Sequence, residues 1–179
     1  MHSQSTPSLA ENPRARPLRR VGVDAPGRDR LREVVANLTT LTLTLHRLCW
    51  EVEQRGDAAL RGLLQTRLPT LERCRDRLAG LCVELAVSNV GVASSRARAR
   101  GDAALSPRER ARVLTRARAL QDITLRLSEV LVELHGPLTR RPTLAGPVAA
   151  RLESATRELA SDIAAVDEVH RRATGQRPA

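Results

Sequence analysis

Apolar residues recur every three or four positions along residues 31–52, and this spacing constrains the fold more than any other feature of the chain. Thr40 to Leu45 also alternates Thr and Leu, a pattern that suits a strand because Thr is β-branched. We reject the strand because the helical period extends over a much longer stretch than the alternation does. The repeating positions, which share one face of a helix, are Leu31, Val34, Val35, Leu38, Leu41, Leu45, Leu48, Cys49 and Val52.

Three further segments repeat this spacing, so the sequence predicts four helices. Gly56 is expected to end the first helix and Asp57 to cap the second, which contains Pro69. Ser106-Pro107-Arg108-Glu109 has the form of a capping box and begins the third. The expected bounds are about Asp29 to Arg55, Asp57 to Ser88, Ser106 to a stop at Gly136-Pro137, and Ala145 or Pro147 to Ala173. The expected core of the last three helices is Leu60, Leu64, Leu68, Leu71, Cys74, Leu78, Leu81 and Leu85, then Leu114, Ala117, Leu120, Ile123, Leu127, Leu131 and Leu134, then Val148, Leu152, Ala155, Leu159, Ile163, Val166 and Val169.

The lengths of the connections predict how these helices are arranged. Short connections make antiparallel pairs of the first two helices and of the last two, while residues 89–105 form a long crossover. Two hairpins joined by a long crossover describe a ferritin-like four-helix bundle, which we place at residues 28–175. Residues 1–27 are rich in Pro, Ser, Arg and Gly and have too little apolar surface to offset the entropy of ordering. We therefore expect a basic, disordered N-terminal tail.

Basic charge is concentrated in two stretches of the chain. All 30 basic residues are Arg and the formal net charge is +10. Residues 1–32 have seven Arg against three acids, and residues 92–118 have eight Arg against two acids, which together account for the whole excess. Two local patches indicate an anionic partner more strongly than a diffuse excess would. The alternative is that GC-rich codon usage favours Arg and that both patches are merely solvated.

The sequence contains no sign of export or of membrane insertion. The first 27 residues lack the apolar core of a signal peptide, and no apolar run approaches the roughly 20 residues of a membrane span. Cys49, Cys74 and Cys82 are odd in number, and the last two are about 12 Å apart on one helix, too far to form a disulfide. We expect a cytoplasmic protein with reduced thiols and no membrane partner.

Part of the chain resembles the Dps proteins, the mini-ferritins. Val35-Ala36-Asn37-Leu38, His46 and Trp50 match the family pattern V-A-N-L followed by H-x-x-H-W, and Cys49 stands at the metal-binding position before the Trp. The match continues without gaps to Asp76-Arg77-Leu78-Ala79, where the family has Asp-Glu-x-Ala-Glu. It covers the first two helices by motif and the last two only by length and order.

The resemblance implies a twelve-copy shell that stores iron, protects DNA under stress and associates with the nucleoid, with a di-iron ferroxidase site at each twofold interface. The five family ligands fall on Cys49, Arg61, Gln65, Asp76 and Gly80. Only Asp76 keeps a hard oxygen ligand, and Arg61 is a permanent cation where Fe(II) prefers imidazole or carboxylate. We predict that ferroxidase activity is lost or weak, that no cofactor is required, and that Asp76 and Cys49 are remnants of the metal site. Iron binding itself stays open.

These residues also have purely structural interpretations. His46 is expected to be a polar helix residue that packs near Trp50, and Cys49 and Cys74 to be small core residues. Asp76 is expected to be an ion-pair partner for an Arg.

Our leading hypothesis is a Dps-like shell protein that binds DNA without sequence preference, through Arg contacts to phosphates. One alternative is an active mini-ferritin that oxidises iron at a rearranged site built from acids such as Glu72, Asp76 or Glu84. Another is a helical interaction module with neither activity. The residues expected to contact DNA are Arg14, Arg16, Arg19, Arg20, Arg28, Arg30, Arg96, Arg98, Arg100, Arg108, Arg110 and Arg112.

Overall fold

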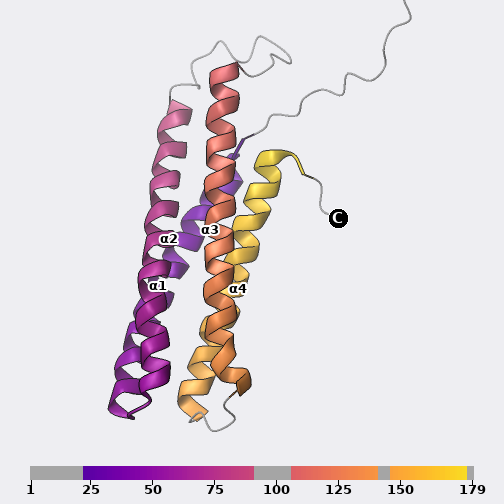
Figure 1. The fold of residues 1–179 in the computed structure, drawn as a ribbon. Helices are drawn as coiled ribbons and strands as arrows, with labels where there is room; N and C mark the ends of the chain where they lie inside the picture. Colours follow the sequence, from indigo (N-terminus) through magenta and orange to yellow (C-terminus); the bar gives the residue numbers. More distant parts are fainter. Residues whose placement is uncertain (1–21, 91–105, 141–145, 177–179) are drawn as a thin grey trace, which may run out of the picture.

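The computed structural model describes residues 22–90, 106–140 and 146–176, which form four long helices and contain no strand (Figure 1). The predicted all-α class and the predicted four helices are therefore confirmed. The expected disorder of the tail concerns residues up to 21, which lie outside the described residues. The helices are α1 (Ala25–Gln54), α2 (Ala58–Val90), α3 (Pro107–Arg140) and α4 (Gly146–Thr174).

The start of α1 lies earlier than the sequence analysis placed it. Asp24 is the N-cap residue, and its Oδ1 accepts a hydrogen bond of 2.8 Å from Gly27 N, while Pro26 occupies the first turn. Gly27 is buried, and a Cβ atom there would lie 3.5 Å from the Val169 side chain of α4. The expected boundary between tail and bundle at residue 27 is wrong, because Pro26 belongs to a helix start rather than to a Pro-rich tail.

The turn between α1 and α2 has the chemistry that the sequence indicated. Gly56 has a φ of 74°, a left-handed conformation that favours glycine. Asp57 then accepts a hydrogen bond of 3.1 Å on its Oδ1 from Leu60 N, as expected of the residue that caps α2. The two helices are thereby joined by a tight connection and pack as an antiparallel pair.

Proline does not interrupt the helices where the sequence suggested a stop. α2 continues through Pro69, and α3 continues through Pro137 to Arg140. The expected end of the third helix at Gly136-Pro137 is therefore wrong. A proline removes one backbone hydrogen bond, but Leu138 packs against the core and the Thr139 hydroxyl donates a 2.9 Å hydrogen bond to the Gly136 carbonyl. These contacts hold the last turn of α3 in place.

The stripes of apolar residues meet in one core, and nearly all the predicted positions are buried. Leu114 is the exception, because its side chain is 57% exposed and lies before Ala117, the first buried residue of α3. Val130 was not predicted and is fully buried. Burying one Leu or Val side chain stabilises the fold by about 1.5–3 kcal/mol, so the core dominates stability. Val35, Leu131 and Ile163 are only partly buried and pack at the edge of the core.

Ion pairs between α2 and α3 show that these helices are antiparallel. Arg67 pairs with Glu133 and Arg77 pairs with Asp122, so residue numbers rise along one helix as they fall along the other. A crossover that ran the length of the bundle would instead leave the two helices parallel. The expected ferritin-like crossover is therefore wrong, and the bundle is up-down-up-down.

Chain length gives the physical reason for this topology. α3 has 34 residues and is about 51 Å long at 1.5 Å per residue. Residues 91–105, which connect α2 and α3, could span about 50 Å only if they were fully extended. Joining two neighbouring helix ends requires no such extension.

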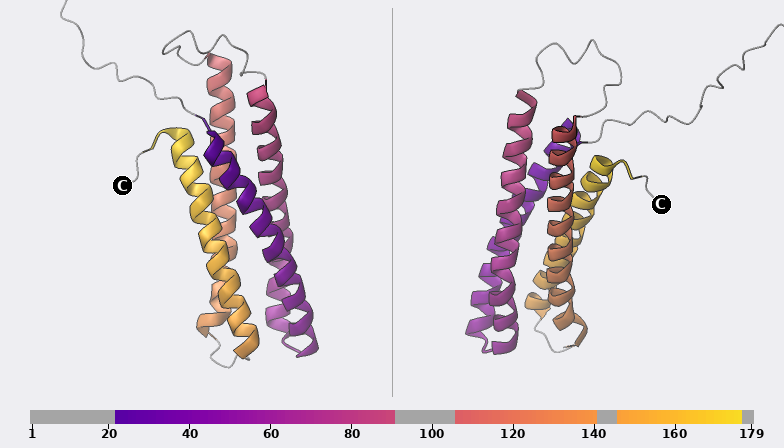
Figure 2. Two further views of the ribbon diagram at one scale, coloured as in Figure 1. Left: turned by 180° about the vertical axis from the view of Figure 1, so that it is seen from behind. Right: turned by 45° about the horizontal axis from the view of Figure 1, so that its top comes forward.

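The four helices pack in a ring, in which each helix contacts the next and α4 closes against α1. Arg151 and Asp162 of α4 contact Glu51 and Asn37 of α1 respectively, so this pair is antiparallel too. Consequently α1 and α3 begin at the same end of the bundle (Figures 1 and 2). A ferritin-like crossover would have placed these two helix starts at opposite ends.

Candidate nucleic-acid interface

The beginning of α3 is the most exposed part of any helix. Residues 106–112 are all exposed, and Ala117 is the first buried residue of the helix. Figure 1 shows this part of α3 rising beyond the ends of α1 and α4. We call residues 106–118 the α3 projection.

Positive charge surrounds the α3 projection. It contains five Arg, and Glu109 is its single acidic residue. Because successive residues turn by about 100° around a helix axis, the Arg side chains are distributed around the helix rather than on one face. These residues are Arg108, Arg110, Arg112, Arg116 and Arg118.

The carboxylate of Glu109 is occupied within the helix cap. Ser106 N donates a 2.8 Å hydrogen bond to Glu109 Oε2, and Glu109 N donates a 3.3 Å hydrogen bond to Ser106 Oγ. The predicted capping box is thereby confirmed. The hydrogen bonds from Ser106, assisted by the charge of Arg112, lower the pKa of Glu109 and keep it ionised.

Arg side chains at a helix N-terminus are electrostatically unfavourable in the absence of an anion. The helix dipole places positive potential there, and a cation in the first turns opposes it by roughly 0.3–1 kcal/mol. A phosphate at the start of α3 would meet both this potential and the surrounding Arg side chains. The α3 projection is therefore suited to bind an anion.

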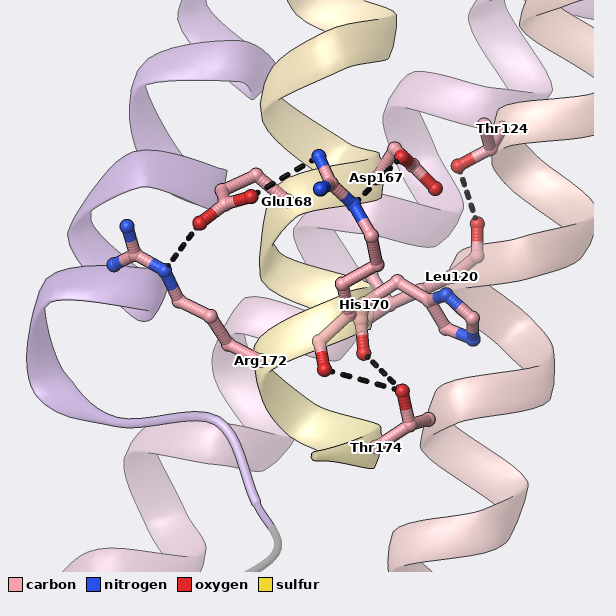
Figure 3. A network of polar contacts seen from close by, with 8 residues as sticks. Leu120, Thr124, Asp167, Glu168, His170, Arg172 and Thr174 are labelled. Carbon is pink, nitrogen blue, oxygen red and sulfur yellow. Dashed lines mark hydrogen bonds and ion pairs between the residues drawn. The ribbon is translucent and has the colours of Figure 1, made fainter. Parts of the chain in front are cut away.

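The end of α4 has the opposite electrostatic arrangement, although it is also rich in Arg. Arg172 Nε donates a 2.7 Å hydrogen bond to Glu168, as Figure 3 shows. Arg171 contacts Asp167 at 3.0 Å and Glu168 at 3.0 Å. These Arg charges are balanced within α4 and stabilise its C-terminus through the dipole.

The structure describes five of the twelve Arg residues expected to contact DNA. Arg108, Arg110 and Arg112 lie together on the α3 projection, whereas Arg28 and Arg30 lie in the first turns of α1. Arg30 forms an ion pair with Glu33, and Arg28 is half-buried with a buried Nε that has no hydrogen-bond partner in the described part. The remaining seven, Arg14, Arg16, Arg19, Arg20, Arg96, Arg98 and Arg100, lie outside the described residues.

The residues at the family's metal positions do not fit a di-iron centre in this structure. Cys49 is buried, Arg61 forms an ion pair of 3.0 Å with Glu53, and Gly80 offers no ligand. Asp76 has a side chain 67% exposed and pairs with Arg75 at 2.8 Å, about 16 Å along α2 from the position of Gln65. No group of three or more His, Cys, Asp or Glu residues that could hold a metal ion occurs in residues 22–90, 106–140 and 146–176.

His46 faces α2 and contacts an acid there. Its Nε2 lies 3.1 Å from Glu72 Oε1. Together with Cys49, Trp50 and Glu53, these residues line a shallow hollow of about 380 Å³ between α1 and α2. The side chain of Trp50 is 63% exposed, so His46 and Trp50 lie at an open surface rather than in the core.

The three cysteines are free and buried, as the structural interpretation of Cys49 and Cys74 expected. Burial raises the pKa of the Cys82 thiol, an effect that the charge of Arg32 partly offsets. Buried neutral thiols behave as small apolar side chains.

Sequence reasoning missed one buried polar pair between α1 and α4. Asn37 Nδ2 donates a 3.0 Å hydrogen bond to Oδ1 of Asp162, which is only 3% exposed. Asp162 occurs one position before Ile163, which was assigned to the core. The neighbouring apolar residues gave no warning that an acid would face inward.

Comparison with known proteins does not assign the chain to a family: no family model, no curated protein and no solved structure matches it. In the part of the chain that the structure describes, none of the helices is both long and apolar enough to cross a membrane.

Proposed function

We propose that this protein binds DNA without sequence preference, and that the α3 projection is its main contact. The observation that supports this most directly is an exposed helix start with five Arg residues and one acid, whose carboxylate is engaged by Ser106. Elsewhere, as at the end of α4, Arg charges are paired with acids of the same helix. The proposal needs neither iron oxidation nor a shell.

The dimensions of an exposed helix suit the major groove. A helix with its side chains is about 10–12 Å across, and the major groove of B-DNA is about 12 Å wide. Residues 106–118 contain no Asn or Gln, the side chains that read adenine most directly. We therefore expect Arg to contact mainly phosphates, which gives affinity without base specificity.

The topology of the bundle supports a single binding end. α1 begins at the same end as α3 (Figure 1), so residue 22, where the basic N-terminal segment joins the bundle, lies at the end that carries the α3 projection. Two basic segments attached at one end can engage the same duplex, and the second contact then benefits from a high effective concentration.

The test is the salt dependence of binding to a fluorescein-labelled duplex, measured by anisotropy. The triple variant Arg108→Gln, Arg112→Gln, Arg118→Gln should bind more weakly, and the slope of log affinity against log salt should fall by roughly 2.7, or 0.9 per lost phosphate contact. The matched control removes three exposed Arg residues away from this end, Arg47, Arg55 and Arg157. It should change the slope much less.

Two results would contradict the proposal. If both triple variants lost affinity and slope equally, the effect would follow net charge and not the α3 projection. If the full chain did not bind duplex DNA at low salt, the excess of Arg would reduce to codon bias. Equal affinity for heparin would identify a general polyanion site instead of a DNA site.

A further inference from the structure

A second hollow, of about 400 Å³, lies between the middle parts of α2 and α3. It is separate from the α3 projection, because Arg126 lies about 21 Å along the helix from Arg112. It is lined by Arg73, Cys74, Arg77, Asp122, Ile123 and Arg126.

The charges around this hollow are unequal. Arg77 forms an ion pair with Asp122 Oδ2, and Arg126 Nε lies 3.7 Å from Asp122 Oδ1. Arg73 donates a 3.1 Å hydrogen bond from Nη2 to the neutral hydroxyl of Thr70. Three guanidinium groups therefore share one carboxylate, which leaves a local excess of two positive charges.

The floor of the hollow is apolar and close to all three Arg residues. Cys74 and Ile123 are 3% and 1% exposed. Burial raises the pKa of the Cys74 thiol, while the charges of Arg126, Arg73 and Arg77 act in the opposite direction. The thiol is therefore neutral, and the three guanidinium groups lie near enough to influence it.

We propose that this hollow binds a phosphate dianion, either inorganic phosphate or the phosphate of a monoester. A phosphate monoester carries a charge of about −1.5 to −2 at neutral pH, which matches the excess of two positive charges. Guanidinium groups bind phosphate oxygens through paired hydrogen bonds, and the apolar floor accommodates the organic part of a monoester. A DNA backbone phosphate is a diester with a single charge, so this site does not depend on the proposed DNA binding.

The first experiment is calorimetric titration of the full chain with inorganic phosphate at pH 7.5, with the ionic strength held constant by NaCl. Arg73→Gln and Arg126→Gln should each weaken binding by about tenfold, the size expected for one charge-assisted contact. Arg157→Gln is the matched control, because Arg157 is exposed on α4 and does not line the hollow. Its phosphate affinity should equal that of the unchanged chain.

A second variant should strengthen binding, which no loss of folding can imitate. Asp122 competes with a bound anion for Arg77 and Arg126, so Asp122→Asn should increase phosphate affinity several-fold. Asp76→Asn is the control, since it removes the same charge from α2 at a residue paired with Arg75 outside the hollow. It should have a much smaller effect.

Two further ligands identify the chemistry. Sulfate, a dianion, should compete with phosphate, whereas dimethyl phosphate, which imitates the DNA diester, should bind at least about tenfold more weakly. The proposal is overturned if Arg73→Gln and Arg157→Gln variants bind phosphate equally, if Asp122→Asn and Asp76→Asn have equal effects, or if the unchanged chain binds no phosphate. Preferential binding of dimethyl phosphate would assign the hollow to the DNA surface.

Discussion

Replacing Asp162 by Asn should stabilise the protein at neutral pH. The carboxyl group is 3% exposed between α4 and α1, and it accepts one hydrogen bond, from Asn37, on Oδ1. Its Oδ2 is buried and has no hydrogen-bond partner among the described residues. Burial raises the pKa of Asp162 above its ordinary value, the hydrogen bond from Asn37 and the charge of Arg30 oppose this, and two neighbouring glutamates reinforce it.

The sign of the effect follows from proton binding. Because the pKa of Asp162 is raised in the folded state, the folded chain holds this proton more tightly than the unfolded chain. The contribution of Asp162 to stability is therefore most favourable below the ordinary pKa of 3.8, and it is lost as pH rises through the folded-state value. Above that window the buried carboxylate remains a constant cost.

The size of this cost can be judged from the structure. One carboxylate oxygen is left unsatisfied in the interior, and leaving a buried polar group unsatisfied costs about 1–3 kcal/mol. Asn at position 162 keeps the acceptor for Asn37 and removes the charge. We therefore expect Asp162→Asn to raise the free energy of unfolding at pH 7 by about 1–3 kcal/mol, reduced by whatever its own amide N–H groups leave unsatisfied.

Guanidinium unfolding followed by circular dichroism, at pH 7 and at pH 3.5, measures this difference. The gain from Asp162→Asn should be largest at pH 7 and nearly absent at pH 3.5, where both forms of residue 162 are neutral. Glu153→Gln is the control, because Glu153 is exposed on the same helix. A gain that was equal at both pH values, or an Asn variant less stable than the unchanged chain at pH 7, would refute the reasoning.

Four further predictions concern packing, the tail and assembly. Gly27→Ala should destabilise the protein by about 1–3 kcal/mol, since its Cβ would lie 3.1 Å from the Val23 side chain, whereas Gly80→Ala, in open space on α2, should stabilise it by about 1 kcal/mol; thermal unfolding compares them. Leu127→Ala should cost about 2–5 kcal/mol and Leu125→Ala, 59% exposed, less than about 0.5 kcal/mol. Deleting residues 1–21 should leave the unfolding temperature unchanged but lower the salt slope of DNA binding by up to about 3.6. In native mass spectrometry a twelve-copy shell of this 19.6 kDa chain would weigh about 235 kDa; because the ferritin-like topology is absent, we expect a smaller species.

The core was predictable because it depends on local periodicity. Every Leu of the predicted stripe of α2 is buried, since the three- and four-residue spacing alone decides which face of a helix is apolar. Leu114 obeys the same spacing but is exposed. Spacing identifies a face, and whether another helix covers that face depends on where the neighbouring helices end.

The candidate binding site was predictable in part for a similar reason. The capping box at Ser106 and the Arg residues that follow it are local features, and they lie at the α3 projection as the sequence indicated. The separate roles of the other Arg residues were not predictable. Arg30 and Arg172 are alike in sequence context, yet their partners, Glu33 and Glu168, are known only from side-chain geometry. The hollow around Asp122 combines residues from two helices, so no motif could reveal it.

The sequence by itself determined the four helices, their caps and their apolar faces, because each depends on interactions within a few residues of one helix. Only the tertiary structure decided that α2 and α3 are antiparallel, because the sequence does not specify which helix ends a connection joins. The ion pairs of Arg67 with Glu133 and Arg77 with Asp122 settle that choice. It places the starts of α1 and α3 at one end of the bundle, which brings the ends of two basic stretches together, and it creates the inward position at which Asp162 is buried against α1.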